Sequence, residues 1–313
     1  MLVLNGSQTA AALDSPSLMD AVRDALVAID AGTLSAPPRV AAFTPHGLLG
    51  AMPAYVDGMG LAAKLVSIAP DARTGGLAHG GLVALFDEQD GRPIAVMDAA
   101  AVTAARTAAA ATLSLAVRGG RPIRRVAIVG TGVQAQAQLS LLGALGNDLL
   151  DPQAEVTVAG RSPEAAERLA AKRPDTRTAG IEQAVRGADV VFCCTSAREP
   201  VIRREWLALG AHVSSVGGSE GHEVDDATIA DAELYVEWAG AAAQPPPAGA
   251  HELQGVPPER LRLLGGVLAR PETHTSERLT VFKSTGHAAL DVAAAVVVHR
   301  RALATGAGVD VEM

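Results

Sequence analysis

Residues 126–140, "VAIVGTGVQAQAQLS", decide which fold we expect for this chain. An apolar run rich in valine and isoleucine ends at Gly130, Thr131 and Gly132, and the Ala/Gln/Leu stretch that follows favours a helix. A strand, a glycine-rich turn and a helix in this order form the phosphate-binding turn of dinucleotide-binding sheets, with a small residue, here Ala135, at the third glycine position. A tight turn that holds no ligand remains the alternative.

Glycines at this turn let a pyrophosphate approach the backbone, and the first turn of the helix offers unpaired N–H groups. The residues expected to hold the cofactor phosphates are Gly130, Thr131, Gly132, Val133 and Gln134. The second strand of this unit ends at Arg161 and Ser162. An acidic residue there would accept from a ribose 2′-hydroxyl, whereas an arginine suits a 2′-phosphate, so NADP is favoured over NAD. A solvated surface position for Arg161 is the alternative.

From residue 124 onward, apolar strand-like runs alternate with helical segments, which predicts a doubly wound parallel sheet of the Rossmann type. The runs are "RRVAIVG", "AEVTVAGR", "ADVVFCCTS", "AHVSSVGG" and "AELYVEW". Adjacent cysteines, Cys193 and Cys194, are interpreted as plain strand residues, because neighbouring strand residues point to opposite faces. The Pro-rich stretch 241–255 is expected to be a surface loop.

The segment before residue 120 has a different pattern, which indicates an α+β domain. We expect a helix over 16–31 capped by Ser15, strands around 38–45, 47–53, 61–69 and 81–87, and one long buried helix over 94–118. The last helical segment is apolar on a broad face and is expected to return to this first domain. The expected domains are a discontinuous substrate-binding and dimerisation domain, 1–120 plus 287–313, and an inserted NAD(P)-binding domain, 121–286.

Composition narrows the class of partner. Of the 313 residues, 49% are hydrophobic and 19% are charged, which is typical of a folded globular protein. A net charge of −8 without a basic stripe argues against nucleic acids and acidic membranes as partners, so small molecules are favoured. The 94–118 segment is interrupted by Asp98, Thr103 and Arg106, which favours a core helix over a membrane span. No secretory signal or metal-ligand spacing is recognised, so a cytoplasmic protein without a metal site is expected.

Six ordered segments resemble the ornithine cyclodeaminase and mu-crystallin family. They are "AMPAYVDGMGLAAKLVS" at 51–67, "GLVALFDEQDGRPIAVMDAAAVTAARTAAA" at 81–110, "VAIVGTGVQAQAQ" at 126–138, "VSSVGG" at 213–218, "EVDD" at 223–226 and "VFKSTGHAALDVAAA" at 281–295. The resemblance implies a homodimer formed through the substrate domain, with NAD(P)H on a Rossmann domain. It also implies one of three activities, which are ornithine cyclodeamination, alanine dehydrogenation and reduction of cyclic ketimines such as Δ1-pyrroline-2-carboxylate.

The same resemblance assigns roles to four residues. Arg39 and Arg106 match arginines that bind the substrate carboxylate, Lys64 matches the lysine beside the reacting carbon, and Thr107 lies near the cofactor phosphates. These types suit an α-imino acid, because guanidinium clamps a carboxylate and an ammonium protonates an imine nitrogen. The alternatives are a snorkelling Lys64 and an Arg106 in a buried ion pair with Asp98 or another acid.

Four further residues complete the expected site. His79 fits a position beside the substrate pocket, with a loop histidine satisfied by backbone as the alternative. We expect the nicotinamide near Thr195, Val216 and Ser284, at the carboxyl ends of the strands.

One departure from the family favours a reductase. Cyclodeaminases of the family carry an aspartate directly after "VGG", and this chain has Ser219 followed by Glu220. Serine is not a carboxylate base, so the pattern favours an NAD(P)H-dependent reductase of a small cyclic or acyclic α-imino acid, or an amino-acid dehydrogenase. A redox-neutral cyclodeaminase, with Glu220 as the base, and a non-catalytic ligand-binding protein are the alternatives.

Overall fold

The computed structural model describes residues 1–70, 77–218, 220–270 and 278–312. The chain divides into two compact units, Met1–Arg106 with His287–Met313, and Thr107–Gly286. The first boundary lies inside a helix, between Arg106 and Thr107, and not at residue 120 as the sequence indicated. Within the described residues each unit contains one eight-stranded sheet.

The sheet of the first unit is mostly antiparallel. Its order is β16 (Val309–Asp310), β1 (Leu2–Val3), β7 (Pro93–Asp98), β6 (Leu77–Phe86), β5 (Gly60–Pro70), β4 (Gly47–Val56) and β2 (Leu34–Ser35), and β3 (Val40–Thr44) also pairs with β4. Only β1 and β7 run parallel among these described pairs. The four strands predicted from the sequence are confirmed as β3 to β6.

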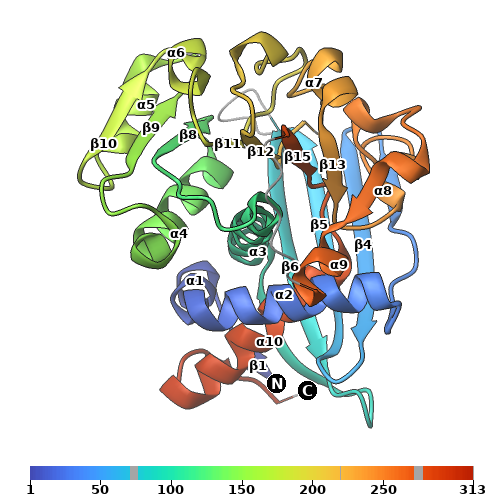
Figure 1. Ribbon diagram of the computed structural model, residues 1–313. Coiled ribbons are helices and arrows are strands. Elements are labelled where there is room, and N and C mark those ends of the chain that lie inside the picture. Colours follow the sequence, from blue (N-terminus) through green and yellow to red (C-terminus); the bar gives the residue numbers. More distant parts are fainter. Residues whose placement is uncertain (71–76, 219, 271–277, 313) are drawn as a thin grey trace. The chain divides into compact units, whose positions relative to one another are not determined.

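Helices α1 (Gly6–Ala12), α2 (Ser15–Ala31) and α10 (Ala288–Thr305) complete the first unit. The carboxylate of Asp14 caps α2 by accepting from Ser17 N at 3.1 Å, so the cap lies one residue before the predicted Ser15. In α10 almost every residue up to Val298 is buried, because the helix packs against α2 and across β4, β5 and β6 (Figure 1). The helix nearest the carboxyl end therefore covers the first sheet.

The helix expected over 94–118 is wrong in its first part. Residues 93–98 form β7, which pairs with β6 and β1, and the helix α3 runs only over Ala99–Leu113 before a 3₁₀ turn, η1 (Ser114–Arg118). A short apolar run fits a strand or a helix equally well, and here two neighbouring strands supply its backbone partners. Asp98 ends the strand and accepts from Ala101 N at 2.7 Å. Among the described residues only 99–118 is long and apolar enough to cross a membrane, and 67% of it is buried.

All strands of the second unit's sheet run parallel in the described pairs. The order is β10 (Thr176–Ala179), β9 (Glu155–Ala159), β8 (Arg125–Val129), β11 (Val190–Cys193), β12 (His212–Ser215), β15 (Thr280–Lys283), β13 (Glu233–Val236) and β14 (Leu261–Leu263). The chain goes outward from β8 to β10 and then returns to β11 on its other side. This confirms the Rossmann-type fold and places the reversal of strand order between β8 and β11.

The second sheet is buried on both faces. Alternate residues of β8 belong to different apolar clusters, Ala127 and Val129 to one and Val126 and Ile128 to the other. This is the burial expected of a parallel sheet covered on both sides. The helices are α4 (Val133–Leu149), α5 (Pro163–Ala170), α6 (Ile181–Val185), α7 (Asp226–Asp231), α8 (Gly240–Ala243) and α9 (Leu264–Ala269), with 3₁₀ turns η2 (Arg204–Trp206), η3 (His251–Leu253) and η4 (Pro258–Arg260).

Two further expectations concern this unit. Cys193 and Cys194 are free and buried, and Cys193 ends β11 as the predicted strand residue, whereas Cys194 directly follows the strand. The 241–255 stretch is only partly the predicted surface loop, because it includes the end of α8 and all of η3. Glu252 and Leu253 of η3 are buried, since the turn packs against the apolar cluster of the sheet.

Candidate active site

A buried ion triad lies in the first unit. The alternation of β5 places Lys64 on the same face as the buried Ala62, the face that α10 covers. Lys64 Nζ lies 2.9 Å from Asp291 Oδ2, and Arg106 Nε donates to Asp291 Oδ1 at 3.2 Å. Lys64 is 4% exposed and Asp291 is 1% exposed, so both charges have left bulk water. The structure thus brings two predicted site residues, Lys64 and Arg106, onto one carboxylate.

This arrangement changes the acidity of the lysine. Burial is the largest influence and lowers the pKa of Lys64, whereas the charge of Asp291 raises it. The positive charges of Arg106 and Arg39 lower the pKa of Lys64 further. An ammonium group with a lowered pKa gives up its proton more readily than a surface lysine does. Lys64 is therefore a more acidic group than an ordinary lysine, which suits a proton donor.

Arg39 and His79, two further predicted site residues, also belong to the first unit. Arg39 is half-buried one residue before β3, and its charge acts on both Lys64 and His287. His79 lies in β6, opposite Ile68 of β5, and its side chain lies outside the described part of the structure. The expected contact of His79 with a substrate therefore remains a prediction.

Sequence reasoning missed two residues of this cluster, Asp291 and His287. His287 caps α10, where its Nδ1 accepts from Ala289 N at 3.2 Å. Burial lowers the pKa of His287 to about 4, so the ring is neutral at neutral pH. Asp291 follows one helical turn later, the only charged residue between Ala288 and Val298. The signal available in the sequence was an acidic residue inside an apolar helix. The alternative stated for Arg106 was a buried ion pair with Asp98 or another acid, and the structure shows an ion pair with Asp291.

The glycine turn after β8 has the shape that a pyrophosphate needs. Gly130 has a φ of +118°, and a side chain there would collide with the carbonyl oxygen of Cys194. A Cβ on Gly132 would meet no atom within 4 Å, which leaves open space in front of the first turn of α4. Gln134 Oε1 is buried and has no hydrogen-bond partner among the described residues. Open space, the amino-terminal turn of a helix and an unpaired polar atom together fit a dinucleotide phosphate.

The carboxyl end of the neighbouring strand, β9, is followed by the residues expected to discriminate NADP from NAD. Gly160 follows β9, and a Cβ there would approach Thr131 Cγ2 to 2.9 Å, so the two turns lie in contact. Arg161 is exposed. The hydroxyl of Ser162 caps α5 by accepting from Ala165 N at 3.1 Å and donates to Glu164 Oε2 at 2.6 Å. Because Ser162 is engaged in capping, Arg161 is the group available to a 2′-phosphate.

The remaining predicted cofactor residues lie in the second unit. Thr195, Val216 and Ser284 directly follow the ends of β11, β12 and β15 or lie within two residues of them, at the carboxyl edge of one sheet. Ser284 Oγ donates to the buried Glu237 at 2.7 Å, and Thr195 Oγ1 donates to the buried Glu223 at 2.7 Å. Thr107 is buried in α3.

The cyclodeaminase alternative depends on the loop after β12. Ser219 lies outside the described residues. Glu220 Oε2 accepts from Arg198 Nε at 3.0 Å, and both side chains are solvent-exposed. Its carboxylate is thus already paired with an arginine at the surface.

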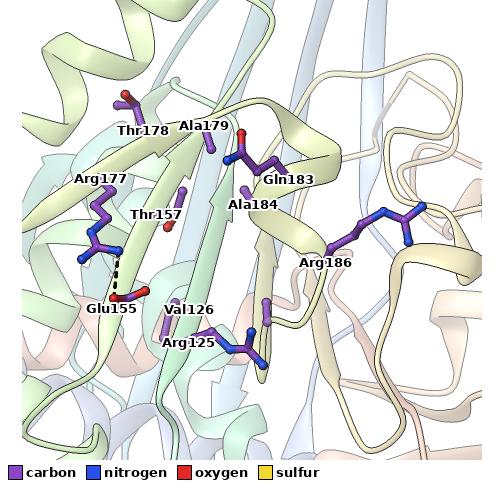
Figure 2. Close-up of a pocket in the computed structure, with 11 residues that line it drawn as sticks. Arg125, Val126, Glu155, Thr157, Arg177, Thr178, Ala179, Gln183, Ala184 and Arg186 are labelled. Atoms are coloured by element: carbon purple, nitrogen blue, oxygen red, sulfur yellow. Dashed lines mark ion pairs between the residues drawn. The ribbon is translucent and has the colours of Figure 1, made fainter.

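A separate cavity of about 260 Å³ lies along β8, β9 and β10 beside α6, and it includes the amino ends of β8 and β9 (Figure 2). Two of its cations are already paired, Arg177 with Glu155 at 2.8 Å and Arg186 with Glu182 at 2.6 Å. Because ligands of such sheets bind at the carboxyl ends of the strands, we do not regard this cavity as the active site. Within the described ranges no group of three or more His, Cys, Asp or Glu could hold a metal ion.

The second unit has the fold of a dinucleotide-binding domain, and the first unit carries a buried lysine–arginine–aspartate cluster. The chain belongs to the ornithine cyclodeaminase/mu-crystallin family, whose family model matches residues 2–306. The family expected from the six sequence segments is thereby confirmed.

Three relatives illustrate the similarity. The chain is 33% identical to the mouse ketimine reductase mu-crystallin over 277 residues, which cover 86% of each chain. It is similar to the structure of Thermococcus litoralis Δ1-pyrroline-2-carboxylate reductase in complex with NADH and L-proline, with a TM-score of 0.87, 25% identity, and coverage of 99% of this chain and 100% of that one. An archaeal alanine dehydrogenase dimer with bound NAD gives a TM-score of 0.86 at 28% identity, with coverage of 100% of this chain and 99% of that one.

Proposed function

We propose that this protein is an NADPH-dependent reductase of a small cyclic or acyclic α-imino acid. The observation that carries the proposal is the buried ammonium of Lys64, which lies 2.9 Å from Asp291 and has a lowered pKa. Reduction of a C=N bond requires a proton at nitrogen, and in this proposal the Lys64 ammonium delivers it. The names of the mouse and Thermococcus relatives, a ketimine reductase and an imino-acid reductase, support the same reaction class.

The arginines of the first unit bind the substrate carboxylate in this proposal. Arg106 uses Nε for Asp291, and a guanidinium has two further nitrogens that can donate to a carboxylate. Arg39 supplies a second guanidinium near the same lysine, because its charge affects the pKa of Lys64. Two guanidinium groups hold a carboxylate in one orientation, which places the imine nitrogen relative to Lys64. We assign His79 of β6 to the same substrate site.

In this proposal Lys64 supplies the proton that the reduction consumes. Its ammonium donates a proton to the imine nitrogen, and the neutral amine that remains is stabilised by burial, which lowers the pKa of Lys64. Asp291 holds the amine in position through both protonation states, since its carboxylate also pairs with Arg106. A bound nicotinamide nucleotide supplies the hydride to the imine carbon.

The second unit provides the cofactor site in this proposal. The residues assigned to it are Thr107, Gly130, Thr131, Gly132, Val133, Gln134, Arg161, Ser162, Thr195, Val216 and Ser284. We propose NADP over NAD because Arg161 is an exposed guanidinium at the end of the second strand, where NAD-specific sites carry an acid. The hydroxyl of Ser162 already has two hydrogen-bond partners. In this proposal Ser162 therefore contributes by capping α5, which fixes the turn that carries Arg161.

We further propose a homodimer formed through the first unit. Its sheet exposes large apolar side chains, with Val40 65%, Phe43 79% and Leu49 51% exposed on β3 and β4. A patch of this kind on a sheet marks an interaction surface. The alanine dehydrogenase relative is described as a dimer. Light scattering is expected to give twice the mass of one chain, and a monomeric mass would contradict this assembly.

The function is tested by following NADPH absorbance with a panel of cyclic and acyclic imino acids. Consumption of NADPH with at least one of them is expected, together with no release of ammonia from ornithine. Lys64→Met is expected to lower kcat by about 10² or more, the usual contribution of a positioned proton donor. Lys172→Met, at an exposed lysine, is the matched control. Ammonia release without net NADPH consumption would identify a cyclodeaminase instead, and a fully active Lys64→Met variant would refute the assigned proton donor.

A further inference from the structure

The second unit contains a buried charge cluster that the proposed chemistry does not use. Glu223 follows the loop after β12, Glu252 lies in η3 and Lys283 ends β15. Each is 5% exposed or less. Lys283 Nζ lies 3.1 Å from Glu252 Oε1 and 3.7 Å from Glu223 Oε2. Stability alone does not explain three buried charged groups, because well-packed apolar residues in their place would stabilise the folded state as well.

The carboxylate of Glu223 joins the carboxyl ends of two neighbouring strands. Its Oε1 accepts from both the backbone N and the Oγ1 of Thr195, each at 2.7 Å, directly after β11. Its Oε2 accepts from Ser215 Oγ at 2.6 Å and from Gly217 N at 2.9 Å, at the end of β12. Four hydrogen bonds to one carboxylate fix the relative position of the two loops.

Lys283 and Glu252 hold that carboxylate in place. Lys283 Nζ donates to Ser215 Oγ at 2.8 Å and to Gly217 O at 2.9 Å, so the third strand end, that of β15, joins the same network. Glu252 Oε1 accepts from Glu223 N at 2.7 Å. A Cβ at Gly217 would collide with the carbonyl oxygen of Thr195, which means that the loops after β11 and β12 are in direct contact.

These loops form the half of the carboxyl edge on the β12 side of the strand reversal. The phosphate turn and Arg161 lie on the other half, after β8 and β9. A dinucleotide that binds across the reversal has its adenine half near β8 and β9 and its nicotinamide half beside β11 and β12. The network therefore touches only the part of the edge where the proposed function puts the nicotinamide.

We propose that Glu223, supported by Lys283, is a positioning residue that holds the nicotinamide-binding loops through Thr195, Ser215 and Gly217. This inference rests on the proposed function, since it concerns the same cofactor site. It adds that the two halves of the cofactor depend on different residues. Loss of the network loosens the nicotinamide end and leaves the adenine end intact.

The test compares binding of whole and partial cofactor by calorimetry. The ligands are NADPH and NADH, each alongside its adenine-side fragment, 2′,5′-ADP or ADP. Glu223→Gln removes the charge and replaces one accepting oxygen with a donor, and it is expected to weaken the preferred dinucleotide about tenfold or more. Binding of the matching fragment is expected to stay within about twofold. Glu182→Gln, which breaks an exposed ion pair with Arg186 in the same unit, is the matched control.

A second variant keeps the inference testable if Glu223→Gln fails to fold. Ser215→Ala removes one 2.6 Å bond to Glu223 and one 2.8 Å bond from Lys283, without changing any charge. A smaller weakening of the dinucleotide, again without loss of the fragment, is expected. Equal weakening of dinucleotide and fragment would mean that the network is merely structural and would overturn the inference, as would unchanged binding of both. Failure of the unsubstituted protein to bind any nicotinamide nucleotide would refute the proposed function itself.

Discussion

Asp291→Asn tests whether one buried carboxylate holds the catalytic lysine. The substitution keeps the size of the side chain but removes the charge that lies 2.9 Å from Lys64 Nζ and 3.2 Å from Arg106 Nε. Two cations would then share an interior position without an anion. Breaking a buried ion pair by removing one partner costs about 3–5 kcal/mol. We expect the free energy of unfolding of the Asp291→Asn variant to fall by about that amount, measured by urea denaturation.

The same substitution is expected to move the pH profile. Burial lowers the pKa of Lys64 and Asp291 raises it, so loss of Asp291 lowers the pKa further. A proton donor is active only while protonated, so activity falls as pH rises through its pKa. The falling limb of kcat against pH should therefore move to lower pH.

Two comparisons make the result specific. Asp310→Asn removes an exposed carboxylate paired with the amino terminus and should change the free energy of unfolding by less than about 0.5 kcal/mol. In the double variant Lys64→Met with Asp291→Asn, the loss of stability should be smaller than the sum of the two single losses by about 0.5–3 kcal/mol. Unchanged stability in Asp291→Asn, with the basic limb where it was, would refute the argument that this carboxylate sets the state of Lys64.

Three further predictions follow from the second unit. Arg161→Asp should weaken NADPH about tenfold or more relative to NADH, because it replaces the guanidinium proposed for the 2′-phosphate; a ratio within about twofold of the original would contradict this. Gly132→Ala should leave the free energy of unfolding unchanged or slightly higher, since its Cβ meets nothing within 4 Å, yet weaken nucleotide binding, whereas Gly130→Ala should destabilise the protein because it collides with Cys194. Burial lowers the pKa of His212 from 6.5 to about 3, so the unfolded chain binds the extra proton between these values. Stability should therefore fall as pH drops through that window, by roughly 1.4 kcal/mol per unit, and denaturation of His212→Asn at several pH values should lack this slope.

Local signals in the sequence were sufficient for five strands of the second unit, β8, β9, β11, β12 and β13, and for its glycine turn. A strand must be apolar to be buried on both faces, so a buried parallel strand is visible as an apolar run. A turn that requires positive φ at Gly130 selects glycine, so the turn is visible as well. The same local reasoning failed at residues 94–98, where "IAVMD" suits a helix or a strand. Its state depends on hydrogen bonds to β1 and β6, which lie far away in the chain or across a turn.

The candidate site divides in the same way. Lys64 and Arg106 were recognisable from the sequence alone because a charged residue inside an apolar segment has to be compensated, and that requirement is visible without knowing the partner. The partner itself was not visible, since Asp291 lies 185 positions from Arg106 and reaches it only because α10 packs across β4, β5 and β6. Glu223 and Lys283 were likewise ordinary charged residues in the sequence. Their role as a buried network exists only because parallel strands distant in the chain end at one edge of a sheet.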